Sequence, residues 1–374
     1  MKHLKCVLAF ILLLNFPSFA QEEKQGVFRD TLDNALDISR WFRDYSGFLP
    51  VVMPITEPAI GFGAVGAGVF LMPKKGPGGE ILPPDILGVG GGLTENGTWV
   101  AGGMYNGYWF NDKVRFKFQG GYGNVVLNYY SQTSPVESIE FTLGSLALMP
   151  SWYFRIKETP FLLGFGYQYL NTDIDAGELE IILPERDLNL VASGLSLNAE
   201  FDKLDNKISP SSGFKLHTEF LQNMELIGSD RNFSKLTLYS LLYIPVSEKW
   251  IPALRFETIK TFGDVPFYSE PYLKLRGVPA MRYQGELTAL VEMENYLGLT
   301  SRWGLVGFAG YGQTYIEDLD TSQLNKATSA WNAGAGFRYL IARLYGMRSG
   351  IDIARGPEEW AIYVTIGSSW SFLN

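Results

Sequence analysis

The chain has 374 residues, a formal net charge of −8 and a single cysteine. The negative charge disfavours a nucleic-acid partner, and one cysteine excludes a disulfide framework. The aromatic content is 14%, glycine occurs 41 times and the mean hydropathy is close to zero. These values are typical of a β protein in which apolar and polar side chains alternate.

Residues 1–20 are predicted to form a secretory signal peptide. Two lysines give a basic start, Val7–Leu14 is apolar, and Ser18–Ala20 forms a small-residue cleavage site. The apolar run is too short for a membrane-spanning helix. Cleavage removes Cys6 and two lysines but no acidic residue, so the charge of the mature chain falls from −8 by two, to −10.

Residues 21–57 are predicted to be a periplasmic segment, separate from the β domain that follows it. Within Arg29–Tyr45, apolar side chains recur at nearly helical spacing among charged ones, which predicts a short amphipathic helix. We expect this helix to pack against the rest of the protein rather than to plug a pore. Pro50, Pro54 and Pro58 exclude a continued helix and lead into the first strand.

Strand patterns recur through residues 58–374, which we predict to be the barrel domain. In Trp360–Phe372, large apolar side chains alternate with small and polar ones. In Val114–Tyr122 and Phe214–Gln222, Phe and Leu alternate with Arg, Lys, His and Glu. Charged side chains cannot face a dry core without partners, but they can line a water-filled lumen. The predicted fold class is all-β, a transmembrane antiparallel β-barrel of the bacterial outer membrane.

The barrel is predicted to have about 16 strands, because roughly 22 residues per strand and connection divide the mature chain into that number. We recognise fifteen strand segments in the sequence. Bacterial single-chain barrels close with an even number of strands. We therefore expect that one of the segments recognised between residues 114 and 160 contains two strands.

One connection carries the motif that narrows the family. The segment Leu275–Tyr283 contains the pair Arg276-Gly277 and lies between two predicted strands. Together with the ordered segments around it, this pair resembles the BamA/TamA superfamily, also called the bacterial surface antigen superfamily. The resemblance covers about residues 195–374 well and 58–190 loosely. The supporting segments are Asp202–Gly213, Glu294–Tyr296, Trp303–Gly310, Gly334–Tyr339 and Ile351–Ala354.

The resemblance implies that this connection folds back into the barrel, where its arginine pairs with carboxylates of the late strands. Strand alternation places Glu292 and Glu294 on the inward face, and Asp352 is opposite in phase to its apolar neighbours. Guanidinium groups form two-point hydrogen bonds with carboxylates. We predict that Arg276 bonds one or more of these three acids. The alternative is that all four are ordinary lumen charges.

Two departures from the family pattern matter. The family commonly has an aspartate where this chain has Gly310, so one carboxylate partner is missing. Family members that assemble proteins usually carry periplasmic POTRA domains, and the roughly 38 residues between Ala20 and Pro58 are too few for one. The chain therefore resembles a barrel-only subgroup, which puts client capture by such domains in question.

By resemblance, the protein is expected to aid the insertion or translocation of proteins or other components at the outer membrane. Its expected partners are outer-membrane lipid and either unfolded outer-membrane protein clients or periplasmic partners. No nucleic acid is expected among them.

A lateral seam is predicted between a first strand at Ala59–Met72 and the last strand, because glycine weakens a strand. Transient opening there would expose backbone edges to a client strand. The alternative is that the glycines only let the sheet curve. The seam residues are Gly61, Gly63, Gly66, Gly68, Trp370 and Phe372.

Two other functions stay open. A passive channel or plain structural barrel would show the same charged inward faces. A barrel enzyme would use His217, the one histidine of the mature chain, with a nucleophile that no motif reveals. No catalytic residue, metal site or cofactor is predicted, because the mature chain has no cysteine and no clustered histidines.

Overall fold

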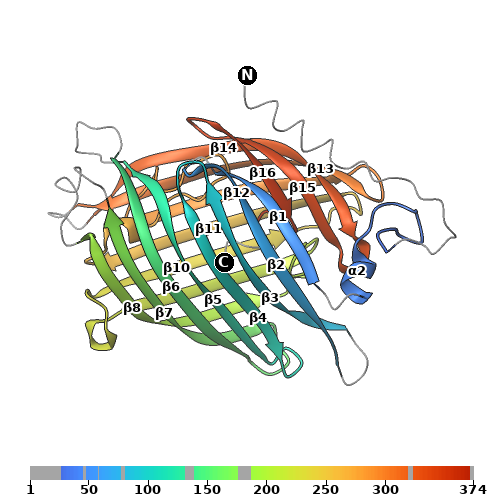
Figure 1. The fold of residues 1–374 in the computed structure, drawn as a ribbon, viewed down its shortest axis with the longest axis horizontal. Helices are drawn as coiled ribbons and strands as arrows, with labels where there is room; N and C mark the ends of the chain where they lie inside the picture. The colour runs from blue at the N-terminus through green and yellow to red at the C-terminus, as the bar shows by residue number, and fades with distance from the viewer. Residues whose placement is uncertain are drawn as a thin grey trace.

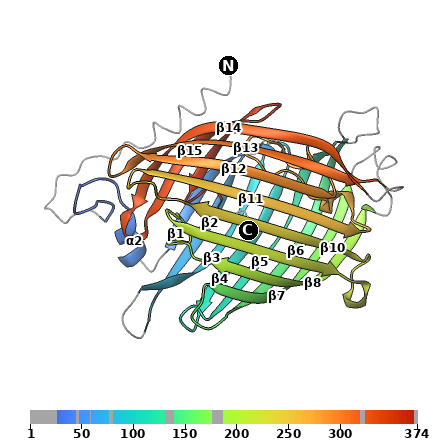
Figure 2. The same ribbon diagram turned by 180° about the vertical axis from the view of Figure 1, so that it is seen from behind.

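The computed structural model describes residues 27–44, 48–57, 59–76, 81–130, 139–175, 187–318 and 323–370, and the predicted signal peptide lies outside them. The described chain forms one 16-stranded antiparallel sheet in which strands that follow one another in the chain pair with each other. The sheet curls into a barrel (Figure 1 and Figure 2). This architecture confirms the predicted fold class.

The strands follow one another through the chain, with short helices before and between them. None of the described helices is long and apolar enough to cross a membrane. The helices are α2 (Ser39–Asp44) and the 3₁₀ helices η4 (Glu225–Ile227), η5 (Phe267–Ser269) and η6 (Arg343–Tyr345). The strands are β1 (Phe48–Glu57), β2 (Gly61–Lys75), β3 (Ile81–Thr94), β4 (Trp99–Trp109), β5 (Val114–Tyr129), β6 (Ile139–Arg155), β7 (Phe161–Asp175), β8 (Asn189–Asp202), β9 (Gly213–Asn223), β10 (Phe233–Tyr243), β11 (Trp250–Gly263), β12 (Leu287–Gly298), β13 (Trp303–Glu317), β14 (Leu324–Ala342), β15 (Met347–Arg355) and β16 (Trp360–Ile366).

The two ends of the barrel differ in the length of their connections. One end has short turns at residues 110–113, 299–302 and 343–346, whereas the other carries the long connections 176–188 and 264–286. Outer-membrane barrels have short periplasmic turns and longer outer loops. The short-turn end, where α2 also lies (Figure 1), is therefore the periplasmic end.

Side chains alternate between a lipid face and the lumen. Leu163, Val291 and Ile353 point outward and are about half exposed, as expected for a surface that faces hydrocarbon. Arg115 and Glu292 point inward and are at most 4% exposed. The charged residues of the strands therefore line the lumen, as the sequence pattern predicted.

An aromatic belt lies on the outer wall toward the periplasmic end of β4–β7. The ring centroids of Trp109 and Phe116 are 5.6 Å apart, those of Phe116 and Trp152 are 5.0 Å apart, and those of Trp152 and Phe165 are 5.5 Å apart. Aromatic side chains gather where a barrel meets the membrane interface. The belt therefore marks the periplasmic membrane boundary on this side of the barrel.

The barrel begins one strand earlier than the sequence predicted. Residues 48–57, assigned above to the N-terminal segment, form β1 and pair along their whole length with β2. The barrel therefore starts with β1 rather than at residue 58. The sixteenth strand is β1, so the prediction of an unrecognised strand between residues 114 and 160 is wrong. Proline is tolerated in an edge strand, so Pro50 and Pro54 do not exclude a strand at this edge of the sheet.

The predicted helix within Arg29–Tyr45 is mostly wrong. Only α2 is helical, and residues 27–38 form turns and irregular structure with one antiparallel bridge between Arg29 and Leu36. The side chains of Asp30 and Asp33 accept hydrogen bonds from backbone N–H groups two residues further along the chain. Such local bonds compete with a helix.

The same aspartates fix the N-terminal segment to the periplasmic rim. Arg302, in the turn between β12 and β13, pairs with Asp33 at 2.8 Å, with Asp37 at 2.7 Å and also with Asp30. The Arg302 side chain is only 4% exposed, so these ion pairs are shielded from water. The segment therefore packs on the rim, beside η6.

The last strand ends at Ile366 rather than at Phe372. Gly367 has a φ of +79°, a left-handed conformation that turns the chain away from the wall. Trp370 consequently lies in the lumen with 2% of its surface exposed, instead of on the lipid face or at the seam. Phe372 lies outside the described residues.

The glycines predicted to border the seam belong to β2, which lies between β1 and β3. Gly61, Gly63, Gly66 and Gly68 are therefore one strand away from it. A Cβ atom on Gly63 would lie 2.2 Å from the carbonyl oxygen of Leu93, so the close approach of β2 and β3 requires glycine there. This contact favours the alternative in which glycine lets the sheet curve.

Replacing Gly63 by valine should destabilise the barrel, because the added side chain meets backbone. We expect Gly63→Val to lower the free energy of unfolding by about 1–3 kcal/mol. Gly66→Val is the matched control, since nothing lies within 4 Å of a Cβ at that position. Samples of each variant are heated in SDS and run on a cold gel, and the temperature at which the folded band disappears measures their stability. Equal temperatures for the two variants would contradict a special requirement for glycine at position 63.

The N-terminal segment should leave the rim in acid. Burial raises the pKa of Asp37, but hydrogen bonds from Ser39, Arg302 and the N–H of Arg343 outweigh burial and hold this pKa below its usual value. A lowered folded pKa stabilises the contact above the unfolded pKa of about 3.9, and the stabilisation is lost as the pH falls through the folded value.

A nitroxide label at Thr31→Cys, an exposed position, reports this release. Its spectrum should be immobilised at pH 7 and become mobile as the pH is lowered below the unfolded pKa of about 3.9 and through the lower folded value. Arg302→Ala should make the label mobile at every pH. A label that stays immobilised in that variant would show that the aspartates do not hold the segment.

Candidate functional site

The connection between β11 and β12, residues 264–286, returns from the outer end into the lumen, and we call it the inner loop. Leu273, Leu275 and Val278 are each at most 4% exposed and pack in one cluster with Leu290 of β12. Apolar burial on both sides of the predicted motif thus anchors the loop to the wall. The loop lies inside the barrel, as the resemblance implied.

Gly277 lets the loop touch the last hairpin, which is formed by β15 and β16. It has a φ of +80°, and a Cβ atom there would lie 2.9 Å from the backbone nitrogen of Gly356. Its N–H donates to the hydroxyl of Tyr363 on β16 at 2.8 Å. Only glycine combines this backbone conformation with so close an approach.

Arg276 meets all three acids named from the sequence. Its Nε donates to Glu292 Oε1 at 3.1 Å, and its Nη1 donates to Glu294 Oε2 at 3.0 Å and to Asp352 Oδ2 at 2.9 Å. Glu292 is 1% exposed and Asp352 is 0% exposed. One guanidinium therefore joins the inner loop to β12 and to β15 in a space shielded from water.

Two residues of β13 complete the surroundings of Arg276. The guanidinium carbon lies 3.4 Å from the ring centroid of Phe308, a cation–π contact. A Cβ atom on Gly310 would lie 2.6 Å from Asn332 Oδ1 and 3.0 Å from Leu275 Cδ2. The space at this position, where the family commonly has an aspartate, is thus occupied by Asn332 and the inner loop.

Two buried arginines of the wall also neutralise these acids, and the sequence analysis missed both. Arg255 lies 3.6 Å from Glu292 and 3.1 Å from Glu257, and Arg338 Nη2 donates to Asp352 Oδ2 at 3.0 Å. A buried carboxylate is costly unless it is paired. The alternation that placed Glu292 inward also places these arginines inward, so it could have found them.

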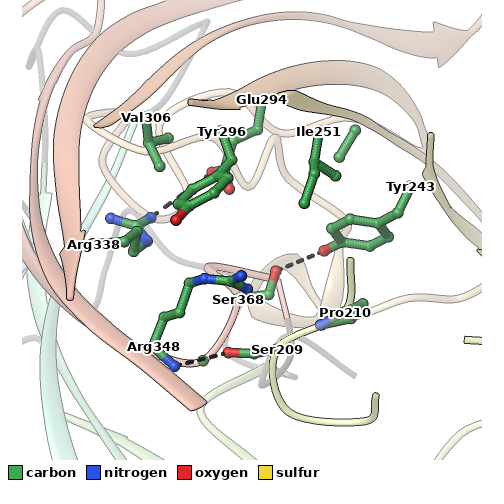
Figure 3. A pocket seen from close by; sticks show the side chains of 12 residues that line it. Ser209, Pro210, Tyr243, Ile251, Glu294, Tyr296, Val306, Arg338, Arg348 and Ser368 are labelled. Carbon is green, nitrogen blue, oxygen red and sulfur yellow. Dashed lines mark hydrogen bonds and ion pairs between the residues drawn. The ribbon is translucent and has the colours of Figure 1, made fainter. Parts of the chain in front are cut away.

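The chain after β16 reaches the same centre, and we call residues 367–370 the lumenal segment. Ser369 Oγ accepts a hydrogen bond from Arg276 Nη1 at 3.1 Å, and Trp370 Nε1 donates to Glu292 Oε2 at 2.6 Å. No sequence signal pointed to this contact. A cavity of about 40 Å³ lies beside the segment, with Tyr243, Tyr296, Arg338, Arg348 and Ser368 among its lining residues (Figure 3).

A second charged cluster surrounds His217. Arg115 Nη1 lies 2.8 Å from both Glu200 and Asp202. His217 Nδ1 is 3.8 Å from Glu200 Oε2 and has no hydrogen-bond partner. Within the described part of the chain, no serine, threonine or cysteine side chain bonds to His217 Nδ1. The same residues contain no group of three or more His, Cys, Asp or Glu side chains that could hold a metal.

The seam of the barrel lies between β1 and β16. These strands lie side by side, but no ladder joins them in the residues that the structure describes. Every other pair of neighbouring strands is joined by a ladder. The wall therefore has one boundary without backbone pairing, and each of its two strands has one edge that no strand pairs with.

Removing Arg276 should destabilise the barrel strongly, because Glu292 and Asp352 would stay buried with less neutralising charge. Breaking a buried ion pair costs about 3–5 kcal/mol, and we expect a loss of this size for Arg276→Ala in the free energy of denaturant unfolding. Arg276→Lys should recover only part of it, since an ammonium group lacks the forked donors.

Arg282→Ala is the control, because Arg282 pairs with Glu358 at 3.2 Å and both side chains are about one-third exposed. Partly exposed pairs contribute about 0–1 kcal/mol. Tryptophan fluorescence in guanidinium measures all three variants. Equal losses for Arg276→Ala and Arg282→Ala would contradict a central role for Arg276.

The fold is similar to that of solved outer-membrane barrels. BamA from Haemophilus ducreyi, solved without POTRA domains 1–3, is 12% identical with a TM-score of 0.55, and the match covers 85% of this chain and 69% of that chain. CdiB from Escherichia coli is 13% identical with a TM-score of 0.55, over 85% of this chain and 61% of that chain. CdiB from Acinetobacter baumannii is 12% identical with a TM-score of 0.54, over 85% and 59%. This chain thus spans about three-fifths to two-thirds of these proteins.

No curated protein matches the sequence. A family model described as the Omp85 superfamily domain matches residues 85–277, which is just over half of the chain. The described residues that precede β1, residues 27–44, contain no POTRA domain. The resemblance to BamA/TamA barrels is thereby confirmed: the chain belongs to the Omp85 superfamily and is a barrel of the bacterial outer membrane.

Proposed function

We propose that this protein, after removal of residues 1–20, aids the insertion or translocation of proteins or other components at the outer membrane. The observation that carries the proposal is the seam between β1 and β16, which has no ladder among the described residues. Unpaired strand edges are templates for another strand. An unfolded client strand would pair with these edges, and outer-membrane lipid would surround both partners.

The inner loop supports the proposal because it holds the last hairpin from inside the barrel. Arg276 bonds Asp352 of β15, the N–H of Gly277 bonds the hydroxyl of Tyr363 on β16, and Tyr283 donates to Glu358 in the turn between these strands at 2.6 Å. The hairpin therefore has anchors that do not involve β1. The seam can open while these anchors stay in place.

The sequence of β1 also supports an opening seam. Pro50 and Pro54 cannot donate a ladder hydrogen bond to any neighbour. The two prolines therefore reduce the number of backbone donors that β1 can offer to any neighbouring strand. A client strand, in contrast, can add to the edge of β16 without meeting a proline.

No observation favours the passive channel. The inner loop and the lumenal segment meet at the centre of the lumen, and Ser368 N–H donates to the carbonyl of Ile208 in the turn between β8 and β9 at 2.8 Å. These contacts place two segments of the chain inside the lumen, where they would narrow an aqueous path. In this proposal, client capture occurs directly at the barrel.

A disulfide across the seam tests the proposal. Val52 and Ile362 point outward on β1 and β16, so Val52→Cys is combined with Ile362→Cys, or with Val364→Cys if that pair oxidises more completely. The barrel is reconstituted in liposomes, and the probe is a urea-unfolded eight-stranded outer-membrane barrel. Assembly is measured as the fraction of probe that resists unfolding on a cold SDS gel.

We expect oxidation to slow probe assembly to the rate of empty liposomes and a reductant to restore it. The control joins Ile353→Cys to Ile362→Cys, which face each other on the laddered strands β15 and β16. Oxidation of the control should change nothing. Assembly that continues at full rate through an oxidised seam would refute the proposal.

A further inference from the structure

The lumenal segment is bound as a peptide is bound in a recognition site. Its contacts are made by side chains of β10, β12, β14, β15 and the inner loop. Tyr239 OH donates to the carbonyl of Trp370 at 3.2 Å, and the hydroxyls of Tyr243 and Ser368 are 2.7 Å apart. Backbone and side-chain groups of the segment are thus both recognised.

The site has an apolar part for the Trp370 ring. This ring lies in a cluster with Tyr239, Leu241, Tyr243 and Ile251, and its centroid is 6.1 Å from that of Tyr243. The indole N–H is satisfied by Glu292, which is 1% exposed. A buried carboxylate at the end of an aromatic pocket selects an aromatic side chain that carries a donor.

The site has a polar part for the residue before the tryptophan. Ser369 Oγ is 3.1 Å from Arg276 Nη1 and 3.0 Å from Arg338 Nη2. The two arginines also bind the carboxylates of the site. A small hydroxyl side chain fits between them, whereas an acidic side chain would add a charge to carboxylates that are already paired.

The segment is joined to the wall by one glycine. The N–H of Gly367 donates to the carbonyl of Arg348 at 2.7 Å, which is its last backbone hydrogen bond to β15. The positive φ of Gly367 sends the following residues inward. The geometry is that of a ligand on a short tether, with an effective concentration on the order of mM.

We propose that the lumen contains a peptide-binding site whose resident ligand is the lumenal segment, and that it accepts in trans an extended segment of small hydroxyl residues followed by tryptophan. The existence of the site does not depend on the proposed function. Its use by a client segment that displaces the resident one does rest on that function. Because Glu292 binds both Trp370 and Arg276, occupancy of the site is linked to the position of the inner loop.

A chain that ends at Gly367 tests the site, because it leaves the pocket without its ligand. The probe is a fluorescein-labelled peptide with the sequence of residues 366–374, IGSSWSFLN. Fluorescence anisotropy in nanodiscs should show saturable binding to the shortened barrel. The full chain should bind at least about tenfold more weakly, since micromolar peptide cannot compete with a tethered ligand at millimolar effective concentration.

Two controls keep the test decisive. A peptide with Trp370→Ala should lose binding to the shortened barrel. A shortened barrel with Glu292→Gln should bind the original peptide more weakly than the shortened barrel with Glu292 does, while keeping its folded band on a cold SDS gel. If the shortened chain does not fold, full-length Trp370→Ala, whose own segment lacks the anchor, is expected to bind the peptide instead.

Equal binding to the full and shortened chains, or equal binding of the alanine peptide, would overturn the proposal. Full-length Trp370→Ala that folds and does not bind would overturn it as well. The assay contains no client, so failure of the insertion activity would leave its result unchanged.

Discussion

Three carboxylates buried at the centre of the lumen constrain the rest of the structure. Glu292 and Asp352 are almost completely shielded from water, and Glu294 is 8% exposed. Such charges are tolerated only with paired, hydrogen-bonded cations. Arg276 supplies one cation from the inner loop, so the loop must lie inside the barrel. Arg255 of β11 and Arg338 of β14 supply two further cations. Both side chains must therefore face the lumen, which determines which residues of β11 and β14 point inward.

This arrangement explains how the barrel can leave one boundary unladdered. The last hairpin is fastened through Asp352, Tyr363 and Glu358 to the inner loop. A wall whose last strands are held from within does not need β1 to hold them. Stability and an open seam are therefore compatible, and the same buried centre also binds the lumenal segment. Changes at Glu292 are consequently expected to affect the loop and the segment together.

The sequence predicted those features in which a local pattern and the final environment agree. Alternation placed Glu292, Glu294 and Asp352 inward, and the Arg276-Gly277 pair identified the loop that meets them. It failed where one residue overrides a pattern. The alternation of Trp360–Phe372 runs through the turn at Gly367, so period two could not show Trp370 entering the lumen. Similarly, prolines are disfavoured in an interior strand but are compatible with an edge strand. That β1 lies at an edge follows only from the order of all the strands in the sheet.

Hydrogen–deuterium exchange of the barrel in nanodiscs measures whether the last hairpin is held by the inner loop and not by β1. Amides that lack a stable ladder exchange fast, whereas those held in one exchange slowly. In a peptide covering residues 48–57, we expect slow exchange only for amides that pair with β2 and fast exchange for those on the edge toward β16. Peptides covering residues 287–298 and 347–355, which have ladders on both sides, should exchange slowly throughout. Protection of β1 equal to that of β12 would contradict the account, because such protection requires a ladder between β1 and β16.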